Sequence, residues 1–380
     1  MVGSTRRLSR AALGGSGGLL ALLLACSAPA ARSAAPAAPA SQSSAAAPAA
    51  TAAPAAAAAP AQASPPAPAT VRVGVLNSIG DAAFTIGMDE GYYAEQGITV
   101  ETITFDSAAR MIAPLSQGQL DTGQGVIGAG AMNAVARGVE IRGIAGASGS
   151  PPGHGNSAFI VRKDLVDQIK SPADLRGRRL GLTATGTGVE VLWAELLKRG
   201  GLTPDDVEFV QLNFSEQVTA LGNAALDVAS PSEPTATLAV DRGFGQVWMR
   251  SDEIIPNHLT SFIWAGPQFV ANTDVAERFM VAALKAVRLY NDAFFKNIPT
   301  AREEVIPIFI KYTPVKDREL YDRMVFQGFD PDGRIDRAIV QHDMDYYVAT
   351  GQLPAPVDMD KLIDMRFADH AVQVLGPYPR

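Results

Sequence analysis

The sequence predicts an α/β protein, in which strands and helices alternate along the chain. Short segments with the apolar alternation of strands are followed by segments with the apolar spacing of helices. The alternation passes through two successive sets, the first over residues 71–162 and the second over residues 171–265. Because such patterns form sheets that helices cover, each set indicates a parallel, helix-covered sheet.

The first set opens with a strand at residues 71–75, in which three valines alternate with other residues. Asp106 and Ser107 are expected to begin a helix, because short polar side chains accept hydrogen bonds from the free N–H groups of a first turn. The other elements expected here are a helix at 84–93, a strand at 98–105, a helix ending near 117, a helix at 129–137, and strands at 139–145 and 158–162.

The second set starts at Ser171, which can cap a short helix whose first position suits Pro172. Its expected strands lie at 179–183, 208–212, 226–229, 246–249 and 261–265, with helices at 187–199, at 216–223 and from 234. The strand at 261–265 is expected to return to the first lobe.

Beyond Asn272 the pattern becomes helical. Val275, Phe279 and Ala282 begin a row of apolar residues spaced by four and three, which predicts a helix with a broad apolar face. Further helices near 301–312, 317–327 and 335–349 are expected to cover the outside of the first lobe.

The first 26 residues resemble a bacterial export signal. Arg6, Arg7 and Arg10 precede an apolar stretch that ends at Cys26 and is shorter than the roughly 20 residues needed to span a bilayer. The run before Cys26 is similar to the lipobox of lipoproteins, which implies a lipidated cysteine that anchors the mature chain to the outer face of the membrane. The alternative is a soluble export signal with an incidental cysteine.

Composition separates a tether from a globular part. Residues 27–70 are almost entirely alanine, proline and serine, so they cannot bury enough apolar surface to order and should form a disordered tether. The residues before 71 carry four arginines and no acids, and removing these charges from the formal net charge of −7 leaves the globular part at −11. That balance argues against nucleic acid as a partner. Without a cysteine after Cys26, the globular part cannot form a disulfide, and we expect no metal or cofactor.

Three separated motifs resemble one known family. They are Glu90–Val100 (EGYYAEQGITV), Gln117–Asp121 (QGQLD) and Lys170–Arg179 (KSPADLRGRR). Their order is similar to that in the extracytoplasmic substrate-binding proteins of ABC importers for nitrate, sulfonates, taurine and thiamine precursors. The resemblance implies a type II periplasmic-binding-protein-like fold with two α/β lobes, a hinge and a ligand cleft. It implies lobe 1 at 71–162 and 262–380 and lobe 2 at 163–261.

The resemblance also implies where the ligand would bind. Loops at the carboxyl ends of parallel strands, next to helix N-termini, offer free N–H groups to polar or anionic ligands. The polar contacts expected on this basis are Asn77, Ser78, Ser107, Gln124, Thr185 and Thr187. Phe84, Trp264 and Phe214 are expected as apolar walls, and Glu233 as an acceptor for a ligand amine. For each of these residues, helix capping or core packing is the alternative.

The resulting hypothesis is a monomeric, lipid-anchored solute-binding protein that closes over a small molecule and docks on an ABC permease. Aromatic walls favour a heterocyclic vitamin precursor, whereas hydroxyls and helix N-termini would equally suit a sulfonate, taurine or nitrate. A ligand-sensing lobe for a signalling partner is a further alternative. An enzyme is not expected, because the related thiamine-pyrimidine synthases use a cysteine-rich motif that is missing after Cys26. The run Gly123–Gly128 has the form G-x-G-x-x-G but lacks the preceding apolar strand of a nucleotide site.

Overall fold

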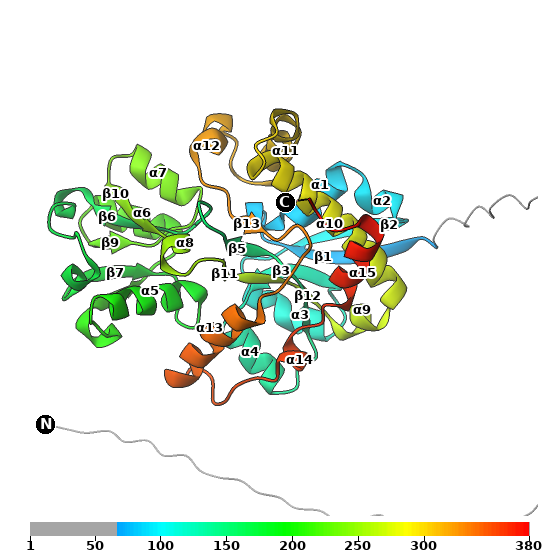
Figure 1. Cartoon of the computed structure of the whole chain (residues 1–380), viewed down its shortest axis with the longest axis horizontal. Coiled ribbons are helices and arrows are strands. Elements are labelled where there is room, and N and C mark those ends of the chain that lie inside the picture. The colour runs from blue at the N-terminus through cyan, green and yellow to red at the C-terminus, as the bar shows by residue number, and fades with distance from the viewer. Residues whose placement is uncertain (1–66, 380) are drawn as a thin grey trace, which may run out of the picture. The chain divides into compact units, whose positions relative to one another are not determined.

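The computed structural model describes residues 67–379 (Figure 1). The expected export signal with Cys26 and nearly all of the expected tether therefore lie outside the described residues. Within residues 67–379, none of the helices combines the length and the apolarity that crossing a bilayer requires.

The strands form three sheets. The strands are β1 (Ala69–Val75), β2 (Ile98–Thr104), β3 (Thr122–Val126), β4 (Arg142–Gly146), β5 (Ser148–Ser150), β6 (Ala158–Arg162), β7 (Arg179–Leu182), β8 (Glu208–Gln211), β9 (Val228–Ala229), β10 (Gly245–Arg250), β11 (His258–Leu259), β12 (Ser261–Ala265) and β13 (Gly328–Phe329). The first sheet has the order β2-β1-β3-β12-β4, the second has the order β10-β6-β9-β7-β8, and a three-stranded sheet has the order β11-β5-β13.

The helices connect these strands and cover the sheets. The α-helices are α1 (Ala82–Asp89), α2 (Tyr92–Glu95), α3 (Ile112–Ser116), α4 (Ala129–Ala136), α5 (Gly188–Arg199), α6 (Phe214–Gly222), α7 (Thr235–Asp241), α8 (Ser251–Ile254), α9 (Pro267–Ala271), α10 (Thr273–Phe294), α11 (Pro299–Tyr312), α12 (Arg318–Arg323), α13 (Arg337–Ala349), α14 (Met359–Leu362) and α15 (Arg366–Leu375). Short 3-10 helices are η1 (Ile79–Asp81), η2 (Ala108–Met111), η3 (Lys163–Leu165), η4 (Pro172–Leu175) and η5 (Pro204–Asp206).

The first sheet is largely the expected parallel one. β1 runs parallel to β2 and β3, whereas β12 is antiparallel to β3 and β4. Figure 1 shows α1 and α10 on one side of this sheet and α3 and α4 on the other. The strand predicted to return to the first lobe is β12, and it joins the first sheet, but it runs antiparallel to both of its neighbours.

One expected placement is wrong. The strand at residues 158–162, expected with the first lobe, is β6 and pairs with β9 and β10 of the second sheet. The helix expected at 335–349 is α13, which packs on α5 and on β11. Its Val340, Met344 and Tyr347 belong to a core that contains residues of α4 and β12 as well as of α5.

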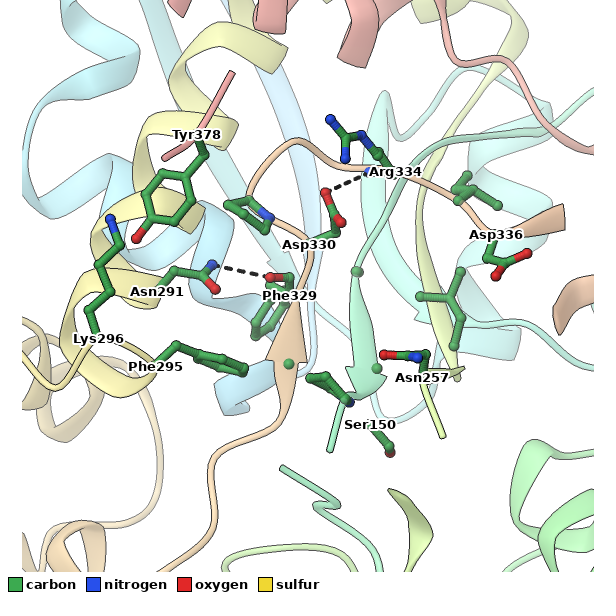
Figure 2. Close-up of a pocket in the computed structure, with 17 residues that line it drawn as sticks. Ser150, Asn257, Asn291, Phe295, Lys296, Phe329, Asp330, Arg334, Asp336 and Tyr378 are labelled. Carbon is green, nitrogen blue, oxygen red and sulfur yellow. Dashed lines mark hydrogen bonds between the residues drawn. The ribbon is translucent and has the colours of Figure 1, made fainter. Parts of the chain in front are cut away.

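The three-stranded sheet was not anticipated. β5 pairs antiparallel with both β11 and β13, and each strand has only two or three residues. All three strands lie in segments that run between the first and second sheets or beside them. Asn291 on α10 fixes β13 by donating a hydrogen bond to the Phe329 carbonyl at 3.1 Å (Figure 2).

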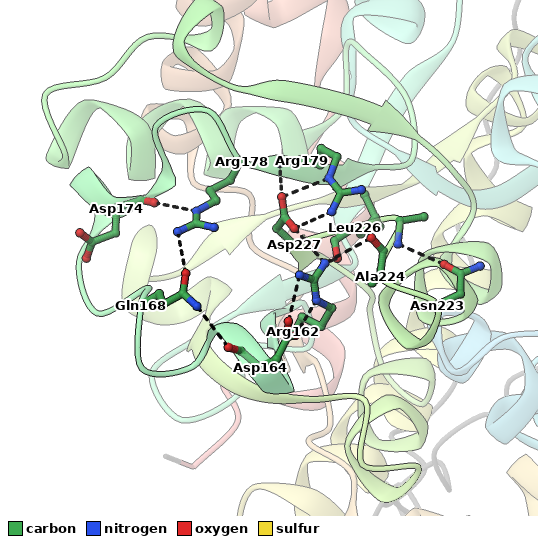
Figure 3. Close-up of polar contacts among 11 residues, drawn as sticks. Arg162, Asp164, Gln168, Asp174, Arg178, Arg179, Asn223, Ala224, Leu226 and Asp227 are labelled. Atoms are coloured by element: carbon green, nitrogen blue, oxygen red, sulfur yellow. Dashed lines mark hydrogen bonds and ion pairs between the residues drawn. The ribbon is translucent and has the colours of Figure 1, made fainter.

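A buried carboxylate organises the second sheet (Figure 3). Asp227, just before β9, accepts hydrogen bonds from the Arg179 backbone N–H at 2.9 Å and from the Arg179 guanidinium at 2.7 Å. It also accepts one from Arg162 at the end of β6, at 2.9 Å. The first sheet has the same arrangement, because Asp121 before β3 accepts hydrogen bonds from both the backbone N–H and the guanidinium of Arg72 on β1. In both sheets, an aspartate just before one strand thus fixes the register of that strand against the parallel strand beside it.

We expect Asp227→Asn to destabilise the protein by about 1–2 kcal/mol, because two arginines lose their shared buried counter-charge. The arginines hold the pKa of Asp227 below its ordinary value, although burial acts in the opposite direction. Its contribution to stability is therefore present above the unfolded pKa near 3.9 and is lost as the pH falls through the folded value. Urea unfolding at pH 7 and pH 3 checks this expectation. Asp164→Asn, which removes an exposed partner of Arg162, is the control and should have little effect.

Candidate functional site

The carboxyl ends of β1 and β3 bring the candidate polar residues together. Ser78 follows β1 and caps η1, with its hydroxyl accepting from the Gly80 N–H at 3.2 Å. Asn77 precedes it in the left-handed region (φ 51°), a conformation that asparagine tolerates better than most residues. These residues lead directly into the N-terminus of α1, where free N–H groups gather.

Gln124 on β3 links this edge to the three-stranded sheet. It is buried, and its Nε2 donates to the Ser261 hydroxyl at 2.6 Å and to the Ser148 hydroxyl at 3.3 Å. Its Oε1 faces the N-terminus of α1, since a Cβ added at Gly80 would lie 3.0 Å from that oxygen. The Gln124 side chain therefore spans from the predicted ligand loops to β5 and β12.

A loop of the second sheet meets the same edge. The segment at residues 183–187 follows β7, and its Gly186 carbonyl accepts from the Ala129 N–H, the first residue of α4, at 3.0 Å. Glu190 on α5 orders this loop by accepting from the Gly186 N–H at 2.5 Å. Thr185 is exposed, and the Thr187 hydroxyl donates to the Ala184 carbonyl at 3.0 Å.

Four predicted site residues belong elsewhere or are already engaged. Phe84 has no exposed surface and packs against Phe279, so it is a core residue and the expectation of an apolar wall is wrong. Trp264 is also in a core, with Nε1 donating to the Gly125 carbonyl at 3.0 Å. The Phe214 side chain is only half-buried and lies at the start of α6.

The Glu233 carboxylate is fully engaged by the protein itself. Its Oε2 accepts from both the backbone and the hydroxyl of Thr237, and its Oε1 accepts from Arg250 at 3.1 Å and from the Val325 N–H at 3.4 Å. With 2 % of its side chain exposed, Glu233 binds its own neighbours and does not present an acceptor to a ligand amine. Ser107, by contrast, is exposed beside η2 and makes no capping bond there.

Asp81 is a residue of this edge that the sequence reasoning missed. Its Oδ2 accepts from the backbone N–H groups of Leu76 and Ser78 at 3.0 and 2.9 Å, which closes the turn after β1. Its Oδ1 is buried and has no hydrogen-bond partner among the residues described. Burial raises the pKa of this carboxyl to about 6, against the opposing effect of the Ser78 hydrogen bonds. The Ser-x-x-Asp spacing of a capping box is the signal that could have identified it.

We expect Asp81→Asn to stabilise the protein at pH 7 by on the order of 2 kcal/mol, because the folded state then buries no charge at this position. The folded pKa lies above the unfolded one, so wild-type stability should fall as the pH rises from about 4 to about 6 and then level off. Denaturant unfolding across this range checks the prediction. The same change at the exposed Asp106 is the control. If the free energy of unfolding of Asp81→Asn varied with pH in the same way as that of the wild type, the raised pKa of Asp81 would be contradicted.

The electrostatics of the edge combine backbone dipoles with two carboxylates, Asp81 and Glu190, which accept hydrogen bonds from loop N–H groups. The loops at residues 76–80, 125–128 and 183–187 contain no lysine or arginine. The N-termini of α1, α4 and α5 all begin there and carry partial positive charge. The edge can therefore hold polar or anionic groups through N–H donors and hydroxyls.

The chain is similar in sequence to a protein family and to individual known proteins. The family model described as NMT1/THI5 like matches residues 81–292. A Brucella abortus protein named "Putative binding protein" is 25% identical over 230 residues, which cover 59% of this chain and 67% of that protein.

Solved structures share the fold. The periplasmic aliphatic sulphonate binding protein SsuA from Escherichia coli matches with a TM-score of 0.64 and 18% identity, covering 79% of this chain and 93% of SsuA. The periplasmic nitrate-binding protein NrtA from Synechocystis PCC 6803 matches with a TM-score of 0.65 and 15% identity, covering 82% and 90%. The desulfurization enzyme DSZB also matches, with a TM-score of 0.56 and 16% identity over 80% of this chain and 99% of DSZB. At these identities the likeness shows the periplasmic-binding-protein fold and no more, and the fold occurs in binding proteins and in an enzyme.

Proposed function

Because the chain belongs to the NMT1/THI5-like family, we propose that it is the solute-binding component of an ABC importer. In this proposal one lobe carries the first sheet, the other carries the second sheet from β6 to β10, and the three-stranded sheet is the hinge. The second lobe then begins at β6 and not at residue 163. The observation that carries the proposal is the meeting of the two strand edges, where Ala129 of one lobe donates to Gly186 of the other. Closure of such edges over a small molecule is the motion that a binding protein needs.

The ligand we propose is a small oxyanion of the sulfonate type. The heterocycle expected from the sequence depended on aromatic walls, and two of the three aromatic residues are buried in cores. The donors left at the edge are the N-termini of three helices and the Ser78 hydroxyl, because the Gln124 amide already donates to Ser148 and Ser261. The carboxylates of Asp81 and Glu190 are occupied by loop N–H groups. Helix N-termini bind anions through backbone N–H groups and do not need a cationic side chain.

Delivery to a permease and attachment to the membrane complete the proposal. We propose that Cys26 carries the lipid anchor and that residues 27–66 tether the globular part to it. Cys26→Ala should then move the protein from the membrane fraction to the soluble extracytoplasmic fraction. Retention of the variant in washed membranes would reject the anchor and leave the binding function standing.

Catalysis is not part of the proposal. Cys26 is the sole cysteine of the chain, so the globular part offers no thiolate nucleophile, and the buried Glu233 and Asp81 hold backbone and side-chain partners of their own. Binding energy would go into lobe closure and release, not into bond breaking.

Calorimetric titration of the purified chain with taurine, ethanesulfonate, nitrate and an aminopyrimidine tests the ligand class. We expect one of the oxyanions to bind and to reduce the radius of gyration in solution scattering, because the lobes close. Binding of the pyrimidine alone would overturn the oxyanion and keep the importer role. Release of sulfite from a sulfonate would overturn the binding role itself.

A further inference from the structure

The three-stranded sheet has a second face that the proposed ligand site does not use. On β5 the Ser148 hydroxyl points toward Gln124 and the strand-end loops. Gly149 alternates with Ser148 along β5, so it faces away from that site. Gly149, together with its neighbours Ala147, Ser150 and Pro151, lines a cavity of about 760 Å³.

This cavity has the size and the walls of a small-molecule site. Binding pockets in proteins commonly enclose about 300–1,000 Å³ and are lined mainly by apolar and aromatic side chains. Here Phe295 and Phe329 form one wall, Tyr378 from the C-terminal segment forms another, and Leu259 and Ile335 lie across from them. Figure 2 shows Phe295, Phe329 and Tyr378 on one side of the cavity and Asn257 on the other.

The charged groups around the cavity already have counter-charges or hydrogen-bond partners. Lys296 pairs with Asp292 at 3.2 Å and lies 3.9 Å from the centre of the Tyr378 ring. Arg334 pairs with Asp332 at 2.9 Å. Asp336 accepts from the Ala338 N–H at 2.8 Å as the cap of α13. A charged ligand would therefore lose its hydration without gaining an unpaired counter-charge, whereas an uncharged one would not incur this cost.

We propose that this cavity is a second binding site, which takes an uncharged, ring-bearing apolar molecule, and that its occupant sets the geometry of the hinge. The cavity is lined by β5, β11 and β13 together, and the occupant would touch all three strands at once. A molecule that fits only one arrangement of these strands shifts the equilibrium between open and closed lobes. This second half of the proposal rests on the proposed function, and the first half does not.

Replacing Gly149 by a larger residue should fill the cavity without straining the backbone. A Cβ at Gly149 would meet the His258 carbonyl at 3.4 Å and the Leu259 side chain at 3.8 Å, which are ordinary contacts, and the residue does not lie at positive φ. Leucine at position 149 would therefore be accepted by the backbone and would extend into the cavity. Gly130, an exposed glycine on α4 with open space around it, offers the same change away from the cavity.

The test is fluorescence titration of the full chain with 2-naphthol. We expect saturable binding that Gly149→Leu weakens at least tenfold and that Gly130→Leu leaves within twofold. Naphthalene-2-carboxylate, the charged analogue, should bind at least tenfold more weakly than 2-naphthol. Equal affinity in all three proteins, no binding up to the solubility limit, or preference for the carboxylate would each overturn the site.

If Gly149→Leu does not fold, methyl NMR spectra of the unaltered chain with 2-naphthol provide a second test of the site. The ring current of 2-naphthol should shift the Leu259 and Ile335 methyl signals, while the exposed Val126 at the other site should not move. Shifts confined to Val126 would place the naphthol at the strand-end site and overturn the cavity assignment.

Coupling is tested separately, by titrating the oxyanion with and without saturating 2-naphthol. We expect its dissociation constant to change at least threefold, and linkage requires the same factor in the naphthol affinity. An unchanged constant would reject the hinge effect while the cavity binding stands. Failure of every oxyanion to bind would count against the proposed function, and the naphthol and NMR results would still decide the site.

Discussion

Alanine at position 128 is expected to weaken ligand capture by roughly 10- to 100-fold, which corresponds to about 1.4–2.8 kcal/mol. Gly128 immediately precedes α4. The N–H of the next residue, Ala129, donates to the Gly186 carbonyl and so joins the edges of the two sheets. A Cβ added at Gly128 would lie 2.4 Å from that same carbonyl oxygen, a distance that real Cβ atoms do not show. The loop at 183–187 must then move away from α4. The hydrogen bond from the Ala129 N–H to the Gly186 carbonyl, which joins the two strand edges, is lost.

The backbone at Gly128 does not itself resist the change. Its φ of −144° and ψ of 173° are ordinary extended values that alanine adopts without strain. We therefore expect the free energy of unfolding to change by less than about 1 kcal/mol, because the clash can be relieved by separating the lobes and not by unfolding them. The effect should thus appear in binding and not in stability.

Calorimetric titration with the ligand identified for the wild type measures the loss, and Gly130→Ala is the matched control. Gly130 lies two residues further along, where an added Cβ meets nothing within 4 Å. A Gly128→Ala protein that binds as tightly as the wild type would show that the approach of these edges is not required for capture. The importer mechanism would then need a different closing contact.

Much of the fold could be predicted because its longer elements repeat a clear pattern. The strands at 158–162 and 261–265 match the predicted bounds, and α5 and α10 begin within one residue of their predicted starts. The partners of β6 could not be predicted in this way, since strand periodicity shows which face is buried but not which sheet the strand joins. β6 is held in the second sheet by its backbone pairing with β9 and β10, and the bond from Arg162 to Asp227 adds to it.

The three-stranded sheet escaped prediction for a different reason. β11 and β13 have two residues each and β5 has three, which is too short for a period of two to be visible. β5 consists only of serine and glycine (Ser148–Ser150), residues that favour turns in any local reading. The pairing of the three strands depends on contacts between segments more than 100 residues apart.

The candidate site was predictable where chain position alone decides it. Ser78 follows β1, and Gln124 lies on β3 two residues before its end, so the parallel pairing of these strands places both residues near one edge. Phe84 and Trp264 lie in the same regions of sequence, yet their side chains turn into the cores. Aromatic side chains bury large apolar areas, and nothing in a single sequence separates a ring that lines a site from one that fills a core.

The largest effect on stability is expected from Asp343→Asn, which should destabilise the protein by about 3 kcal/mol. Asp343 on α13 and His258 on β11 are both buried, and the His258 Nε2 lies 2.9 Å and 3.1 Å from the two carboxylate oxygens. The pair joins α13 to the three-stranded sheet, and a Cβ at Gly188 would lie 2.9 Å from the His258 ring. Replacing the carboxylate by an amide removes a buried charge to which both His258 and His342 are hydrogen-bonded, at the point where α13, α5 and β11 meet.

The pH dependence gives this prediction its sharpest test. Burial by itself raises the pKa of Asp343, but the interactions of its carboxylate with His258 and with His342 outweigh burial and hold the pKa below its ordinary value. The contribution of the carboxylate is therefore fully present above the unfolded pKa of about 3.9 and is lost as the pH falls through the lower folded pKa. Guanidinium unfolding should show the full difference between wild type and Asp343→Asn at pH 7 and a smaller one below about pH 4. Asp345→Asn, an exposed change on the same helix, should leave stability nearly unchanged at both values. A difference between wild type and Asp343→Asn that persists undiminished in acid would mean that the lost packing of α13, and not the charge of the Asp343 carboxylate, accounts for the destabilisation.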